Sequence, residues 1–150
     1  MRVLIIEDNS FNAFCLSRLL EAVCPQVNIS VITNSIDALH ATETFNPNLV
    51  ILDGDLGGGA NQYNGPVLAD IIMRKYPDKA VVAWTDNAPF RSAFEGVFKA
   101  HHRSFNETVM WSKQLSHNDL HQALSKLAAD YNMSYFWQTS GSLHMERLYA

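Results

Sequence analysis

The sequence predicts an α/β protein with a doubly wound (βα)5 arrangement, in which five parallel strands form one sheet covered by helices. Short apolar runs alternate along the chain with longer segments of helical period, which is the pattern of a parallel sheet buried on both faces. The 150 residues, 47% of them hydrophobic, are enough for one well-filled core and too few for two ordinary domains.

Five apolar runs are expected to form the strands. They cover residues 3–6, 28–32, 49–52, 80–84 and 108–111. Since each connection contains a helical segment, the strands should run parallel with right-handed crossovers. The ligand crevice of such a sheet lies beyond the carboxyl ends of its strands.

The helical segments follow the strands in order. Asn9-Ser10 is expected to cap a first, buried amphipathic helix with Cys15 in the core, and Pro25 lies just past its end. The apolar residues that indicate this helix are Phe11, Phe14, Cys15, Leu19 and Val23. Further helices are expected at 35–45, at 66–76 with proline in the first turn, and at 89–101 with its phenylalanines in the core.

The last helix has the clearest start. Ser116 and Asp119 resemble a capping box, and the apolar residues from Leu120 to Tyr131 line one face. Residues 1–131 should therefore form one domain. The remaining segment, 132–150, is too short for an output domain and too apolar for a free tail, so it is expected to pack on the domain or to serve as a contact.

Composition restricts the partners. The net charge of −4 offers no basic surplus, so nucleic acid and anionic membranes are not expected partners. The apolar run after Arg2 is far too short for a signal peptide or a membrane span, which favours a cytoplasmic protein. Cys15 and Cys24 lack metal-ligand spacing and are interpreted as reduced thiols.

Polar residues stand where four of the expected strands end. Glu7 and Asp8 follow the first strand, Asp53 the third, Thr85 the fourth and Lys113 the fifth. Carboxylates gathered in one crevice repel each other and lose hydration, so they need a compensating cation. Mg²⁺ suits them because it takes a few carboxylate oxygens, keeps several waters and bridges to phosphoryl groups.

This order of residues resembles the receiver domain of two-component response regulators (the CheY-like superfamily, with a flavodoxin-like fold). The resemblance covers about residues 2–131 and rests on four fragments: VLIIEDNS at 3–10, NLVILDGDL at 48–56, VVAWTDN at 81–87 and VMWSKQ at 109–114. It implies a single-domain response regulator, a phosphoacceptor signalling protein and not an enzyme in the usual sense.

The resemblance also implies a role for each site residue. Asp53 would accept a phosphoryl group from a sensor histidine kinase or a histidine phosphotransfer protein. Glu7, Asp8, Asp53 and the backbone carbonyl of Asp55 would hold Mg²⁺. Thr85 and Lys113 would bind the new phosphoryl group. The signal would pass to a downstream protein target. A homodimer through the fourth-helix to fifth-helix face or the C-terminal extension is a further expectation.

Four departures from the family pattern surround the site. The loop at 54–64 is long and glycine-rich, and Asp86 stands after Thr85 where a small residue is usual. Met110 stands at the aromatic switch position, and Gln114 replaces the proline after the lysine, where a cis peptide is costly without proline. Asp86 is expected to hinder phosphorylation or to change the lifetime of the phosphoryl group.

Two other functions stay open. The serious rival is a receiver-like module that binds partners without phosphorylation, favoured by Asp86, Met110 and the long loop. The other is a phosphatase of the haloacid dehalogenase type, whose Asp-x-Asp motif resembles Asp53-Gly54-Asp55. That family places its motif on the first strand, whereas here an acid-ended strand precedes it.

Overall fold

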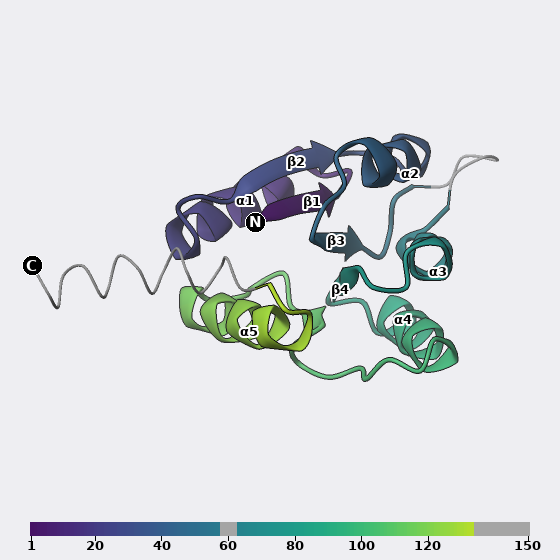
Figure 1. Ribbon diagram of the computed structural model, residues 1–150. Coiled ribbons are helices and arrows are strands. Elements are labelled where there is room, and N and C mark those ends of the chain that lie inside the picture. Colours follow the sequence, from purple (N-terminus) through teal and green to yellow (C-terminus); the bar gives the residue numbers. More distant parts are fainter. Residues whose placement is uncertain (58–62, 134–150) are drawn as a thin grey trace, which may run out of the picture.

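A single parallel sheet with helices on both faces organises the chain (Figure 1). The computed structural model describes residues 1–57 and 63–133. The strands are β1 (Arg2–Ile6), β2 (Asn28–Ile32), β3 (Leu49–Asp53), β4 (Ala80–Trp84) and β5 (Met110–Trp111). They pair in the order β2-β1-β3-β4-β5, and every pair is parallel. The prediction of a doubly wound five-stranded sheet is confirmed.

Two layers of helices cover the sheet. The helices are α1 (Ser10–Val23), α2 (Ser35–Thr44), α3 (Gly65–Lys75), α4 (Ala88–Ala100) and α5 (His117–Asp130). α1 packs beside α5, whereas α3 packs between α2 and α4. No helix within the described residues is long and apolar enough to cross a membrane.

The core lies between these layers and is built from the central strands. Every residue of β3 and β4 is buried, as are Val3 to Ile6 of β1. Such continuous apolar runs are what a strand needs when both of its faces are covered. The helix starts follow local chemistry: the Asn9 side chain accepts a hydrogen bond from the Asn12 amide, and Ser116 and Asp119 form the predicted capping box.

The buried face of α1 differs from the predicted one. The side chains that face the sheet are those of Ala13, Leu16, Leu20 and Val23. Phe11 and Phe14 are 72% and 60% exposed, and Cys15 is exposed as well, so the expectation that Cys15 lies in the core was wrong. The thiol in the core is that of Cys24. The sequence prediction placed the large aromatic residues on the buried face of the helix, whereas the face that is buried contains the small residue Ala13.

Smaller differences lie at the ends of elements. β5 contains only two residues, not the four of 108–111, because Val109 closes a turn with its amide on the Asn106 carbonyl. In α4, Phe94 and Phe98 are buried as predicted, but Phe90 is only half-buried. The expectations for 134–150 and for the middle of the 54–64 loop fall on residues outside the described ranges.

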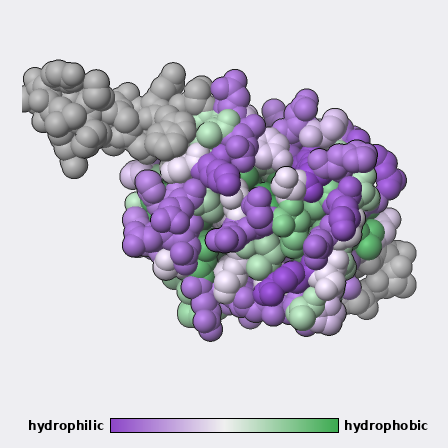
Figure 2. All heavy atoms as spheres, turned by 90° about the horizontal axis from the view of Figure 1, so that it is seen from below, coloured by the Kyte–Doolittle hydropathy of each residue, from purple (hydrophilic) through white to green (hydrophobic). Residues whose placement is uncertain are grey.

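The surface on the side of α4 and α5 is mixed in character. Figure 2 shows hydrophobic surface there between hydrophilic patches. A hollow of about 500 Å³ lies where β5 meets α5, and Met110, Trp111 and Leu115 are among the residues that line it. This hollow is on the predicted fourth-helix to fifth-helix face.

Candidate functional site

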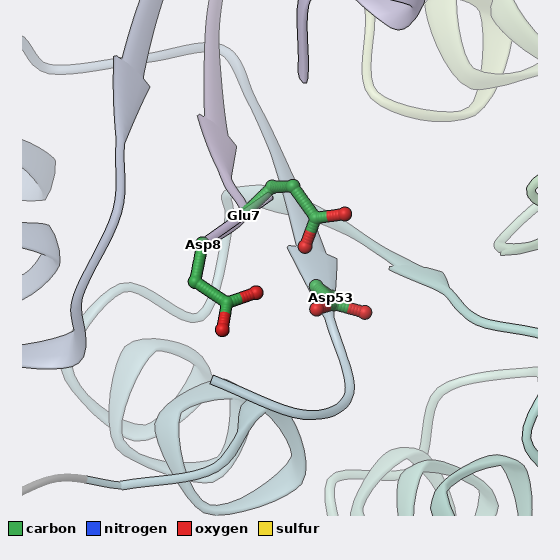
Figure 3. Close-up of side chains that lie close together, drawn as sticks. All are labelled: Glu7, Asp8 and Asp53. Atoms are coloured by element: carbon green, nitrogen blue, oxygen red, sulfur yellow. The ribbon is translucent and has the colours of Figure 1, made fainter. Parts of the chain in front are cut away.

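The carboxylates predicted from the sequence meet at the carboxyl edge of the sheet (Figure 3). Glu7 and Asp8 follow β1, and Asp53 is the last residue of β3, the strand beside it. One oxygen from each of the three side chains lies within 4.8 Å of the others. Glu7 is 1% exposed and Asp53 8%, whereas Asp8 is exposed. The strand-end argument therefore placed these three residues correctly.

Lys113 reaches this group from the loop after β5. Its Nζ lies 2.8 Å from Glu7 Oε1 and 3.1 Å from Asp53 Oδ1. The lysine thus forms ion pairs with both buried carboxylates at once. Other groups assist, since Asn12 Nδ2 donates to Glu7 Oε1 at 2.9 Å and the Gly54 amide donates to Asp53 Oδ1 at 2.8 Å.

The pKa values of the two buried carboxylates shift in opposite directions, although Lys113 contacts both. Burial removes water from Asp53 and Glu7 lies beside it, which together raise the pKa of Asp53 to about 7 against the opposing effect of Lys113. Burial also opposes ionisation of Glu7, but hydrogen bonds with Asp53, Lys113 and Asn12 outweigh it and hold the pKa of Glu7 below its ordinary value. Without further positive charge, a proton that binds to this pair is therefore held mainly by Asp53.

A divalent cation fits this cluster. Glu7 Oε2 is buried and has no hydrogen-bond partner within the described residues, so a ligand for that oxygen would remove an unfavourable feature. The donors are all carboxylate oxygens, which hard cations such as Mg²⁺ prefer. An added positive charge would also favour the ionised form of Asp53.

Thr85 lies next to the cluster, directly after β4. It is 4% exposed, its amide donates to the Trp111 carbonyl at 3.0 Å, and its Oγ1 accepts from the Asn87 amide at 3.1 Å. β4 pairs with β3 so that Trp84 stands opposite Asp53. Thr85 therefore lies one residue beyond the level of the candidate phosphoacceptor.

Asp55 lies in the loop after β3. Its side chain is exposed and accepts a hydrogen bond from the Gly57 amide at 3.1 Å. The loop closes where the Gly65 amide donates to the Gly54 carbonyl at 2.8 Å. A Cβ at Gly65 would come within 2.0 Å of the Asp53 carbonyl oxygen, which explains why glycine begins α3.

Two neighbours of Lys113 were not foreseen as functional. Its Nζ lies 3.6 Å from the ring centroid of Trp84, which was predicted only as a strand residue. Its backbone amide donates to Asp86 Oδ2 at 3.1 Å, although Asp86 was expected to hinder phosphorylation or to change the lifetime of the phosphoryl group. Both contacts join residues far apart in sequence, and the sole signal for them was an aromatic and an acidic residue flanking Thr85.

Several solved structures with the same architecture are receiver domains. A CheY-like response regulator receiver domain protein from Methanospirillum hungatei JF-1 gives a TM-score of 0.72 at 15% sequence identity, over 89% of this chain and 97% of that one. The signal receiver domain of an HD domain-containing protein from Pseudomonas fluorescens Pf-5 gives 0.71 at 17% identity, over 89% and 90%.

The chain has the receiver-domain fold. A longer structure agrees: the RcsB response regulator from Salmonella typhimurium gives a TM-score of 0.70 at 22% identity, over 87% of this chain and 60% of that one. No protein-family model and no curated protein sequence matches the chain. At these identities the receiver likeness is one of fold, and the function has to be argued from the site.

Proposed function

We propose that the protein is a response regulator receiver that takes up a phosphoryl group on Asp53 and signals by binding a downstream protein. The observation that carries the proposal is the joint position of three carboxylates and Lys113 at the carboxyl edge of a receiver fold, with Thr85 directly after the neighbouring strand β4. Any one of these residues alone would have an ordinary structural explanation.

The chemistry follows from these positions. A carboxylate oxygen of Asp53 attacks phosphorus, the P–N bond of a phosphohistidine donor breaks, and the imidazole keeps the bonding electron pair and takes up a proton. The product is an acyl phosphate on Asp53. Lys113, already 3.1 Å from Asp53 Oδ1, would pair with an oxygen of the phosphoryl group, and the Thr85 hydroxyl would donate to another.

Glu7, Asp8, Asp53 and the Asp55 carbonyl are the residues proposed to hold Mg²⁺. When bound there, Mg²⁺ would offset the negative charge on the transferring phosphoryl oxygens. Glu7 and Asp8 keep a ligand role and do not react. Burial of Asp53 among fixed neighbours means that little rearrangement is needed before attack.

The exposed aromatic residues of α1 support a protein donor. Phe11 and Phe14 lie at the start of α1, a few residues after Asp8, and both rings face solvent. Large exposed apolar side chains beside a reactive site mark a surface for protein contact. A histidine kinase or histidine phosphotransfer protein that presents its phosphohistidine to Asp53 would cover this end of α1.

The test is uptake of a phosphoryl group from acetyl phosphate in the presence of Mg²⁺. Intact mass measurement should find one phosphoryl adduct on the wild-type protein and none on Asp53→Asn, whose amide is not a nucleophile of this kind. Chelation of Mg²⁺ should suppress the adduct. A wild-type protein that takes up no phosphoryl group from acetyl phosphate or from a phosphorylated histidine phosphotransfer protein would sink the proposal.

A second candidate is a receiver-like module that binds partners without phosphorylation. The specific observation in its favour is the hollow of about 500 Å³ at β5 and α5, which is lined in part by Met110 and Trp111 and by none of the five site residues. Partner binding that is equal for wild-type protein, Asp53→Asn and protein treated with phosphodonor would favour this module over the phosphorylated switch.

A further inference from the structure

The position of Lys113 needs an explanation, because the sheet does not fix it. β5 ends at Trp111, so Lys113 lies two residues beyond the last strand residue, at the edge of the sheet. A lysine side chain has four rotatable bonds, and its ammonium group is strongly hydrated. Yet its Nζ lies between Glu7 and Asp53, and its side chain is only 21% exposed.

Asp86 fixes the backbone of this lysine. The Lys113 amide donates to Asp86 Oδ2 at 3.1 Å, which ties the loop after β5 to the loop after β4. A carboxylate accepts from a backbone amide more strongly than a neutral group does. The Asp86 carboxylate therefore binds the backbone of the loop that carries Lys113. The sequence had predicted instead that Asp86 hinders phosphorylation or changes the lifetime of the phosphoryl group.

Trp84 fixes the other end of the side chain. Trp84 is 3% exposed and is the last residue of β4, an interior strand of the sheet, so the ring of its side chain offers a firmly held surface. The Lys113 ammonium lies 3.6 Å from the centroid of that ring, within the range of a cation–π interaction, which is strongest for tryptophan. The ring and the two carboxylates thus contact the ammonium group together.

We propose that Asp86 and Trp84 are positioning residues for Lys113: the Asp86 carboxylate anchors its backbone, and the Trp84 ring supports its ammonium group between Glu7 and Asp53. This inference rests on the proposed function, since the purpose of the placement is phosphoryl transfer to Asp53. It assigns an assisting role to Asp86, the residue whose charge otherwise suggests obstruction. Obstruction and positioning predict opposite effects when the carboxylate is removed.

A kinetic experiment separates the two roles. The rate of acyl phosphate formation from acetyl phosphate and Mg²⁺ is measured by intact mass for the wild type, Asp86→Ala and Asp86→Asn. Asp86→Ala should slow the reaction about tenfold, because Lys113 loses its anchor. Asp86→Asn keeps an oxygen that can accept from the Lys113 amide and should retain most of the rate. A faster Asp86→Ala, or equal losses in both variants, would overturn the assignment.

A spectroscopic experiment tests the placement without any phosphorylation. In protein with ¹³C-labelled lysine, the methylene next to the Lys113 ammonium should show an upfield shift from the Trp84 ring, with the signal assigned through its loss in Lys113→Arg. The shift should disappear in Trp84→Leu and in Asp86→Ala, and persist in Trp84→Phe and Asp86→Asn. A shift that survives in Asp86→Ala, or in Trp84→Leu, would refute the positioning role.

The two readouts distinguish the inference from the function on which it rests. If the wild type takes up no phosphoryl group, the proposed function fails and the lysine spectra alone decide whether Asp86 and Trp84 hold Lys113. Asp86 is exposed, so its variants should fold even if a substitution at buried Trp84 does not. The Asp86 pair therefore keeps both experiments decisive.

Discussion

The site has two sides that are built in different ways. The carboxylate side consists of Glu7, Asp8 and Asp53, which stand at the ends of the two adjacent central strands β1 and β3. The lysine side consists of Trp84 at the end of β4, Thr85 and Asp86 directly after it, and Lys113 after β5. Backbone pairing of β1 with β3 fixes the first group, whereas Lys113 is held by contacts with the side chains of Trp84 and Asp86.

This difference separates what is rigid from what can be adjusted. The carboxylate side keeps the three acidic residues that the receiver resemblance implies, although the long loop at 54–64 follows Asp53 directly. A change at these strand ends would disturb the sheet itself. The departure at Asp86 falls on the lysine side, where a substitution can alter how Lys113 is held without breaking a central strand. The departure at Met110 lies in β5, the edge strand that precedes Lys113. Substitutions on the lysine side can therefore alter the placement of Lys113 and leave the carboxylates at the ends of β1 and β3 in place.

The largest effect is expected where a glycine closes the carboxylate side. Gly65→Ala would place a Cβ 2.0 Å from the Asp53 carbonyl oxygen, and the backbone at Asp53 or the start of α3 would have to shift. The free energy of unfolding should fall by about 3 kcal/mol, measured by urea denaturation followed by circular dichroism.

Gly96→Ala is the matched control for that substitution. Gly96 is exposed within α4, and an added Cβ there meets nothing within 4 Å. Alanine should therefore stabilise the helix by about 0.5–1 kcal/mol. Equal effects of the two substitutions would show that the carboxylate side is not the tightly packed region described above.

The next effect concerns the charge on the lysine side. Lys113→Met keeps an unbranched side chain one atom shorter than lysine and removes its positive charge, so acyl phosphate formation should slow about 100-fold. Mg²⁺ should bind more tightly at the same time, because the cation that competes for Glu7 and Asp53 is gone.

Mass measurement of the adduct and calorimetric titration of Mg²⁺ check the two halves of this prediction. Lys113→Arg keeps the charge and should bind Mg²⁺ about as the wild type does. Weaker Mg²⁺ binding by Lys113→Met would mean that the lysine organises the carboxylates and does not compete with the cation.

A smaller effect is expected in the pH dependence of stability. The pKa of Asp53 in the folded protein is raised to about 7, so the folded state binds more protons than the unfolded state between pH 4 and 7. The contribution of this group is complete below the unfolded value of 3.8 and is lost as pH rises toward 7. In the absence of Mg²⁺, stability should therefore fall across that window.

Asp53→Asn removes this titration and leaves Lys113 paired with Glu7 alone. The variant should be more stable than the wild type at pH 8 by roughly 2 kcal/mol and nearly equal to it at pH 4, as measured by urea denaturation in a chelator. The same pH dependence in both proteins would show that Asp53 does not carry the proton.

The sheet and the carboxylate side could be predicted because their signals are local. A fully buried strand is a continuous apolar run, and its end is marked by the first charged residue, as Leu52-Asp53 shows. Parallel strands bring such ends to one edge, so the proximity of Glu7, Asp8 and Asp53 followed from topology.

The lysine side and the face of α1 could not be predicted fully, because their contacts depend on packing. Nothing local to Trp84 indicates that a lysine 29 positions later lies over its ring. The buried face of α1 was predicted wrongly because Phe11 and Phe14 are more hydrophobic than Ala13. Of these three residues, Ala13 is the one buried against the sheet. Packing of the helix against the sheet therefore determined which face of α1 is buried.

The orientation of α1 also leaves one cysteine thiol accessible to solvent. Phe11, Phe14 and Cys15 are spaced to share one exposed face of α1, while Cys24 is buried. A maleimide fluorophore would therefore attach at Cys15 and leave Cys24 unmodified. Its emission would change when a partner covers this end of α1, so the unaltered sequence already contains a labelling site for measuring association.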